Sequence, residues 1–439
     1  MSTASLTPKA RRYLSADGLI EILKQRFQHI EDPRRGSHLT YPLPDVLMAA
    51  FAMFSLKDPS LLAFGDRQDD PSLKNIYRIE NIPSDSQMRE ILDPIDVEHL
   101  NEAFADVFHE LQRGGVLKRF RFQGDQYLVA IDGTGYFCSS AIRCPHCLVK
   151  KSSDGKTKYS HHAVAAVLIH PDLREVIPLA VEPIIKQDGE TKNDCERNAT
   201  RRLLGRVKQL HPRLKLIVTE DGISSNAPHI RDLQEFGYGF ILGAQPGDHT
   251  HLFDQVLEAG EESNYHSVSI AHTKGKTETS WVKDLPLNKS HEDIRVNYIG
   301  QVELSRQGDV RSRFAWVTDQ KTTAQTVQQL ARGGRCRWRI ENETFNTLKN
   351  QGYHFEHNYG HGQQHLSTVL MLLMMLAFLV DQVQQLCCPL FQSVLAKVKR
   401  RKTLWHRLRC AVESFTFRSY REVLEAILSD RSRRGWLPP

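Results

Sequence analysis

Three carboxylates stand where they could meet in one site. Asp132 and Asp221 each follow an apolar run, and Glu341 closes the basic segment Arg337-Trp-Arg-Ile-Glu341. Two aspartates at the carboxyl ends of neighbouring strands would lie at one rim of a sheet, where a packed helix can supply the third carboxylate. Such a cluster can hold two divalent cations and support phosphoryl transfer. Oxygen ligands favour Mg²⁺ or Mn²⁺ over zinc.

Two neighbouring acids compete for these roles. Glu343 is two residues beyond Glu341, and two residues place it on the opposite side of a helix. Strand alternation allows only one of Glu220 and Asp221 to face the site. An Asp-Gly pair after a strand is also a common turn. We favour Asp132, Asp221 and Glu341 as the ligands of two Mg²⁺ (or Mn²⁺) ions.

The apolar patterning places these carboxylates in an α/β fold. Three consecutive strands, followed by alternating helices and strands, are typical of an RNase H-like mixed sheet flanked by helices. One helix is expected to start at a capping-box-like sequence at 193–196 and to carry Leu203, Val207 and Leu210 on one face. Others are expected around 226–236 and after Thr322. The strands are expected at 127–131, 163–169, 176–181, 214–219, 238–242 and 313–318.

The same patterning divides the chain into parts. Residues 1–120 show helical spacing and predict a helical N-terminal domain. Its scattered arginines and lysines suit DNA-end binding or dimerisation, although a plain scaffold fits nearly as well. We expect residues 121–385 to form an RNase H-like catalytic domain, which a β-rich insertion at 246–310 interrupts. Residues 386–439 form a basic helical tail, where the run from Lys399 to Arg409 contains no acid.

Composition sets further bounds. The 439 residues carry a formal net charge of +6, which is modest evidence for a nucleic-acid partner. The start of the chain lacks the pattern of a signal peptide, and we expect a cytoplasmic protein. The longest apolar run, 366–380, is shorter than the roughly 20 residues that span a bilayer. A buried core helix is therefore expected, and no membrane partner.

The segment around Glu341 resembles the signature of the bacterial insertion-sequence DDE transposases whose third carboxylate lies in a Tyr-Arg-Glu-Lys motif. Asp132-Gly133 and Asp221-Gly222 resemble the first two acidic sites of that family. Further stretches look like one bacterial branch of it, namely 133–137, 186–189 with 192–196, 342–345 and 352–358. Together these stretches span about residues 80–380.

The resemblance implies metal-dependent DNA cleavage and strand transfer at the ends of an insertion sequence. Its partners would be transposon ends and target DNA, bound by a homodimer at the bacterial nucleoid. Asp132, Asp221 and Glu341 would be the metal ligands, and Arg337 would contact a phosphate near the transposon end. Two alternatives stay open: an RNase H-like nuclease that does not join DNA, and a catalytically decayed DNA-binding protein.

The sequence departs from the motif at two places. Gly334 stands where the motif has its tyrosine, and Leu348 stands where it has its lysine. Lys349 follows one residue later, which is a rotation of about 100° on a helix.

Further residues are candidates for DNA contact. Lys349 and Arg339 flank the third carboxylate, and His354 belongs to a group of histidines and aromatic residues beyond it. Mixed cationic and aromatic groups suit phosphate contact and base stacking, with ordinary surface histidines as the alternative. Trp281 could stack on an unpaired base, although a strand tryptophan more often only packs.

A cysteine loop is the last candidate. Cys144-Pro-His-Cys147, with Cys138 before it, has the spacing of half a zinc site. His146, His161 or His162 could complete a structural Zn²⁺ site. The alternative is a loop of free thiols, because no second pair of this spacing follows.

Overall fold

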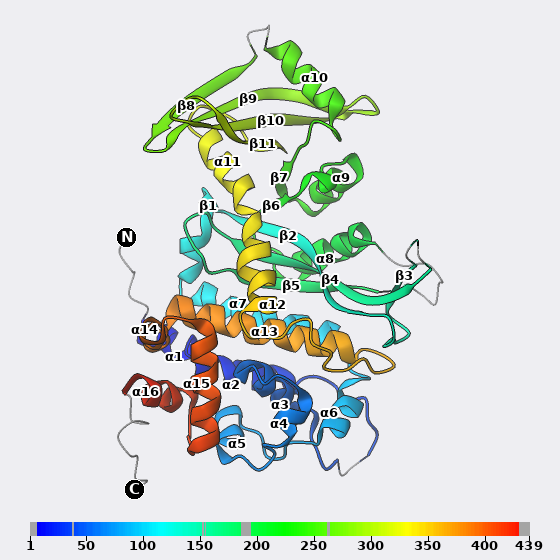
Figure 1. Ribbon diagram of the computed structural model, residues 1–439, viewed down its shortest axis with the longest axis vertical. Coiled ribbons are helices and arrows are strands. Elements are labelled where there is room, and N and C mark those ends of the chain that lie inside the picture. The colour runs from blue at the N-terminus through cyan, green and yellow to red at the C-terminus, as the bar shows by residue number, and fades with distance from the viewer. Residues whose placement is uncertain are drawn as a thin grey trace.

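The computed structural model describes residues 7–36, 39–151, 153, 155–185, 195–260 and 264–429. Its parts are stacked in three tiers in Figure 1, with a β-rich tier at the top, a mixed sheet in the middle and helices at the bottom. Residues from both ends of the chain form the bottom tier.

The middle tier confirms the predicted RNase H-like mixed sheet. Strand β4 pairs antiparallel with β2 and β5, whereas β6 pairs parallel with β2 and β7. Every residue of β5 and β6 is buried, as expected for strands covered on both faces. The bounds are β2 Gln126–Ser139, β4 Thr157–Ile169, β5 Ile177–Ile184, β6 Leu216–Glu220 and β7 Gly239–Gly243. Two short strands extend this sheet, β1 (Arg121–Gln123) on β2 and β3 (Leu148–Lys151) on β4.

The upper tier continues the same sheet. Its strands pair antiparallel in the order β11, β10, β9, β8. The last three residues of β11 pair with β7, so that Trp316 stands opposite Gly243. The bounds are α10 Thr250–Ala259, β8 His266–His272, β9 Gly275–Asn288, β10 His291–Ser305 and β11 Val310–Thr318.

Helices cover the sheet and position its functional rim. Helix α8 packs on β4 and β5, α9 packs on β7, and α11 packs on β6, β7, β9 and β10. The segment η3 packs on β2, the strand that carries Asp132. The bounds are α8 Glu196–Leu210, η2 Gly222–Ser224, α9 Ala227–Phe236, α11 Val327–Cys336, η3 Ile340–Phe345 and α12 Asn346–Asn350.

The lower tier holds the remaining helices. Ser84 caps α6 and forms a capping box with Gln87. The first bounds are α1 Pro8–Tyr13, α2 Ala16–Phe27, α3 Leu43–Leu56, α4 Leu61–Gly65, α5 Pro71–Tyr77, α6 Asp85–Leu92, α7 Glu98–Arg113 and η1 Val116–Phe120. The later ones are α13 Leu366–Cys387, α14 Pro389–Val398, α15 Arg401–Ser414 and α16 Tyr420–Ser429.

Helix α13 is the core helix of the lower tier. Within the described residues it is the one helix long and apolar enough to cross a membrane, but 94% of its most apolar stretch is buried. It packs against α3, α7 and β5, so no membrane span is indicated. Its Asp381 pairs with Lys57, and Tyr353 donates a 2.5 Å hydrogen bond to the same carboxylate.

Candidate active site

The two aspartates lie at matching positions on neighbouring strands. The parallel pairing of β2 and β6 runs up to Ala130 opposite Thr219. Asp132 and Asp221 each follow two residues later, so both side chains belong to the same level of the sheet. The Oδ1 atom of Asp221 accepts hydrogen bonds from the amides of Ile223 (3.0 Å) and Ser224 (3.4 Å). The start of η2 thereby fixes this carboxylate.

Arg337 connects the first and third carboxylates. Its guanidinium lies 3.3 Å from Asp132 Oδ2 and 2.7 Å from Glu341 Oε1. The side chains of Asp132 and Arg337 are 22% and 24% exposed, whereas that of Glu341 is 49% exposed. Two carboxylates from distant parts of the chain therefore share one cation.

The buried position of Asp132 favours its protonated form. Burial is the largest cause and raises the pKa of Asp132 to about 7, against 3.8 for a solvated aspartate. Nearby Glu341 and Glu196 add to this rise, while Arg337 opposes it. Partial burial and the charges of Asp221 and Glu220 also raise the pKa of Glu196.

Glu196 is a site residue that the sequence did not single out. It opens α8, and its carboxyl group lies against Gly133, where an added Cβ would approach it to 2.6 Å. Glycine at 133 therefore leaves the space that this fourth carboxylate fills. Part of the resembling stretch around Glu196, residues 186–194, lies outside the described residues.

The two rival acids have other partners. Glu220 is 4% exposed and pairs with His229. Glu343 is directed at Arg174, 3.5 Å away. The turn that carries Glu341 is π-helical over Ile340–Phe345, whereas a regular helix was expected. Such widened turns are rare in proteins, and those that do occur are often found at functional sites.

The donors fit divalent cations that prefer oxygen ligands. Four carboxylates lie at this edge of the sheet, those of Asp132, Asp221, Glu341 and Glu196. Arg337 is the cation that contacts two of them, Asp132 and Glu341. Their excess negative charge and the raised pKa of Asp132 are what a bound cation would offset. The rim is more open than the cysteine cluster described below, since in the described part of the chain only that cluster has its ligand atoms within 4.8 Å of one another.

The other predicted DNA contacts are dispersed. Lys349 pairs with Glu356 at 2.9 Å, and Arg339 donates a 2.9 Å hydrogen bond to the carbonyl oxygen of Pro171. Partial burial lowers the pKa of His354, and the nearby cations Arg409 and Lys402 of α15 lower it further. Trp281 is 5% exposed and stacks on His266, with ring centroids 5.2 Å apart.

The two departures from the motif have structural reasons. A Cβ at Gly334 would lie 2.3 Å from the indole nitrogen of Trp316, so this ring fills the space of any side chain at that position. Leu348 is fully buried in the apolar core, where a lysine would lose its contact with water. The next residue, Lys349, is partly exposed and can carry a charge.

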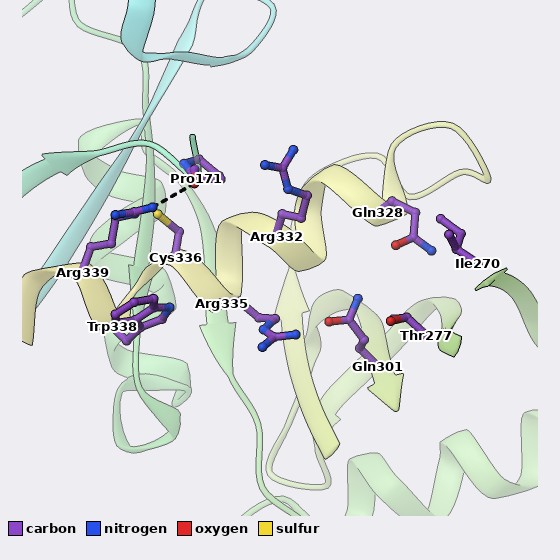
Figure 2. Close-up of a pocket in the computed structure, with 10 residues that line it drawn as sticks. All are labelled: Pro171, Ile270, Thr277, Gln301, Gln328, Arg332, Arg335, Cys336, Trp338 and Arg339. Atoms are coloured by element: carbon purple, nitrogen blue, oxygen red, sulfur yellow. Dashed lines mark hydrogen bonds between the residues drawn. The ribbon is translucent and has the colours of Figure 1, made fainter. Parts of the chain in front are cut away.

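A basic pocket of about 330 Å³ lies along α11 and the turn that follows it. It lies between α11 and the strands of the upper tier, and Arg332, Arg335 and Arg339 line it from α11 and the turn that follows (Figure 2). Trp338 forms part of the wall and is 47% exposed. The sequence did not identify Trp338 as a candidate site residue, because its exposure is known only from the tertiary structure.

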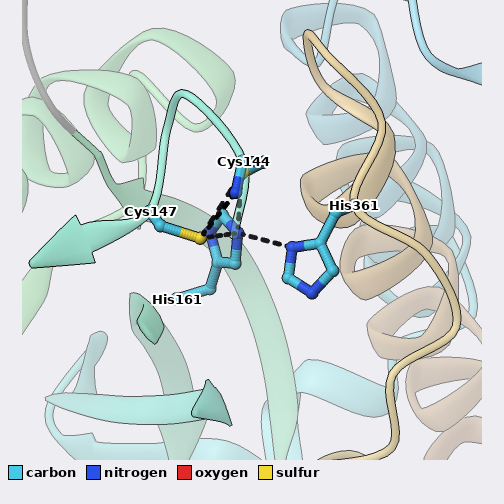
Figure 3. Close-up of side chains that lie close together, drawn as sticks. All are labelled: Cys144, Cys147, His161 and His361. Atoms are coloured by element: carbon cyan, nitrogen blue, oxygen red, sulfur yellow. Dashed lines mark hydrogen bonds between the residues drawn. The ribbon is translucent and has the colours of Figure 1, made fainter. Parts of the chain in front are cut away.

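The cysteine loop meets two histidines. Cys144, Cys147, His161 and His361 converge from the loop before β3, from β4 and from the segment before α13 (Figure 3). Cys138 is exposed and stands outside this group.

Comparison with known proteins gives two matches. Residues 124–379 match the family described as Transposase DDE domain, and residues 24–107 match the family described as DDE_Tnp_1-associated. No curated protein matches the chain.

Proposed function

The chain belongs to the DDE transposase family, and from this premise we propose that it cuts insertion-sequence ends and joins them to target DNA. The observation that carries the proposal is the convergence of Asp132 and Glu341 on Arg337, beside Asp221 at the matching level of β6. DNA binding is implied by the family, and cleavage with joining is the finer activity proposed.

We assign the metal ligands to Asp132, Asp221 and Glu341. Two bound Mg²⁺ or Mn²⁺ ions would supply Lewis-acid activation of the attacking oxygen and stabilisation of the leaving one. Asp132 must give up its proton to serve as a ligand, and its raised pKa makes this step pH-dependent near neutrality. Arg337 is held by two carboxylates in the free protein. When cations engage these carboxylates, its donors become available to a DNA phosphate.

The reaction needs no covalent protein intermediate. Water first cleaves a phosphodiester at the element's end and leaves a 3′-hydroxyl. That hydroxyl then attacks a target phosphodiester, so that one P–O bond forms as another breaks and a new 3′-hydroxyl leaves. The first step is a hydrolysis and the second exchanges one phosphodiester for another, so neither step requires ATP.

We propose that DNA follows the basic surface that Arg332, Arg335 and Arg339 form. Arg339 and Trp338 would meet the backbone and an unstacked base at the wall of the pocket. Lys349 and His354 would extend the contact toward the basic helix α15. Trp281 would reach a base only after its stacking with His266 is broken. A homodimer in the cytoplasm, at the nucleoid, would hold two ends together through the 1–120 domain.

A cleavage assay tests the proposal against its alternatives. The probe is an end-labelled fragment of the genomic DNA that flanks the gene, mixed with supercoiled plasmid and Mg²⁺. The proposal predicts a cut at the element's end followed by label in the plasmid. A nuclease would cut without transferring label, and a decayed protein would bind the fragment without cutting it. Either outcome would refute the proposal.

A further inference from the structure

A second cluster of ligand atoms brings two thiols and two imidazoles together. The distance between Cys144 Sγ and Cys147 Sγ is 3.5 Å, and His161 Nε2 lies 3.2 Å from the first sulfur and 3.4 Å from the second. His361 Nδ1 lies 3.2 Å from His161 Nε2. All four atoms lie within 4.8 Å of one another.

These separations match those of a zinc site. Zinc lies about 2.3 Å from thiolate sulfur and about 2.0–2.1 Å from imidazole nitrogen, so tetrahedral ligands are roughly 3.3–3.8 Å apart. Two cysteines and two histidines are a common structural ligand set. The closed surroundings also fit a structural site, since Cys147 and His161 are 1% and 2% exposed.

Aromatic rings fix the orientation of the two imidazoles. Tyr136 stacks on His161 with 5.6 Å between ring centroids, and Phe137 contacts His361 edge-on at 4.1 Å. Both aromatic residues belong to β2, a few residues beyond Asp132. The packing of this strand therefore determines where the histidine nitrogens point.

We propose that Cys144, Cys147, His161 and His361 bind one structural Zn²⁺ ion. On binding, both thiols release their protons, and two thiolates then balance the dipositive charge of the ion. The complete site is neutral, which makes its burial favourable. Of the residues that the sequence suggested, Cys138, His146 and His162 lie outside the ligand set, and His361 takes the fourth position.

The proposed ion would join the two segments that lead to the active site. Three ligands belong to the hairpin that extends β2, which carries Asp132, and to the adjoining strand β4. The fourth, His361, follows the turn of Glu341 in the chain. Zinc would thus fix the distance between the supports of the first and third carboxylates, and we assign it a positioning role.

Metal content per chain is the first test. Full-length protein made in zinc-containing medium is expected to hold about one zinc per chain by elemental analysis. Replacement by Co²⁺ should give the visible absorption of tetrahedral cobalt together with a thiolate-to-cobalt charge-transfer band. Wild-type protein with background zinc, and no such spectrum after cobalt is added, would overturn the proposal without any variant.

Matched variants identify the ligands. Cys144→Ser and His361→Gln should lose the zinc, whereas Cys138→Ser and His162→Gln should keep it, with circular dichroism to confirm folding. Asp132→Asn should also keep the zinc, which separates this site from the proposed cleavage site. Zinc retained in folded His361→Gln would remove that residue from the ligand set and overturn the proposed link.

Discussion

Replacing Asp132 by asparagine should stabilise the metal-free protein while it abolishes cleavage. The side chain is held near Glu341 and Glu196, and its pKa is raised to about 7 mainly by burial. In the unfolded chain the same group titrates near 3.8. Between these two values the folded protein keeps a proton that the unfolded chain has lost. The stability of the wild type therefore falls as pH rises through this window.

The size of the effect follows from the two values. A rise from 3.8 to about 7 corresponds to at most about 4 kcal/mol of lost stability above pH 7. Water reaches the 22% of the side chain that is exposed, and screening reduces the expected gain in Asp132→Asn to roughly 2 kcal/mol. Near pH 4 the carboxyl group is protonated in the folded protein, and the gain should vanish.

Urea denaturation of both proteins at pH 5 and pH 8, in magnesium-free buffer, measures this difference. Asp125→Asn is a suitable control, because this exposed carboxylate precedes the same strand and pairs with Lys215 at 2.8 Å. That pairing lowers the pKa of Asp125, so its replacement should bring no gain. Adding Mg²⁺ should raise the urea midpoint of the wild type and leave that of Asp132→Asn unchanged. Equal stability of wild type and Asp132→Asn at pH 8 would refute the charge argument.

Three further predictions concern other parts of the molecule. Arg337→Ala should weaken binding to any DNA end and reduce the slope of log affinity against log salt by about one; an unchanged slope would leave Arg337 only its ion pairs within the protein. Glu341→Gln should abolish DNA cleavage, whereas Glu343→Gln should retain most of it in the same assay; the reverse order would exchange their roles. Lys57→Met should lower the free energy of unfolding by about 3–5 kcal/mol in urea denaturation, because it leaves Asp381 buried without its partner; a loss below 1 kcal/mol would contradict this.

The order of secondary structure could be predicted from the sequence because it depends on local patterning. Apolar runs before Asp132 and Asp221 indicated two buried strands, and the structure brings the ends of those strands to the same level. The spacing of apolar residues could not predict the π-helical turn at Glu341. A π-helical turn differs from a regular α-helix only by one extra residue in a single turn, which is too small a change to alter that spacing visibly.

Contacts between distant segments could not be read from spacing. His361 lies 200 residues from His161, and its place in the cysteine cluster depends on how α13 docks beneath the sheet. Glu196 and Trp338 likewise gain their surroundings only from packing. Gly334 shows the same limit, because the reason for a glycine there is the ring of Trp316 on another strand.

Iron-directed cleavage of the protein backbone tests most directly whether three distant carboxylates act as one centre. Fe²⁺ in place of Mg²⁺, with a reductant and peroxide, generates radicals that cut the chain beside the bound ion. The proposed site predicts cuts near Asp132, Asp221 and Glu341 in the same sample, all suppressed by excess Mg²⁺ and all lost in Asp132→Asn. Cuts confined to one of the three segments, or cuts that Mg²⁺ does not suppress, would contradict a shared metal site.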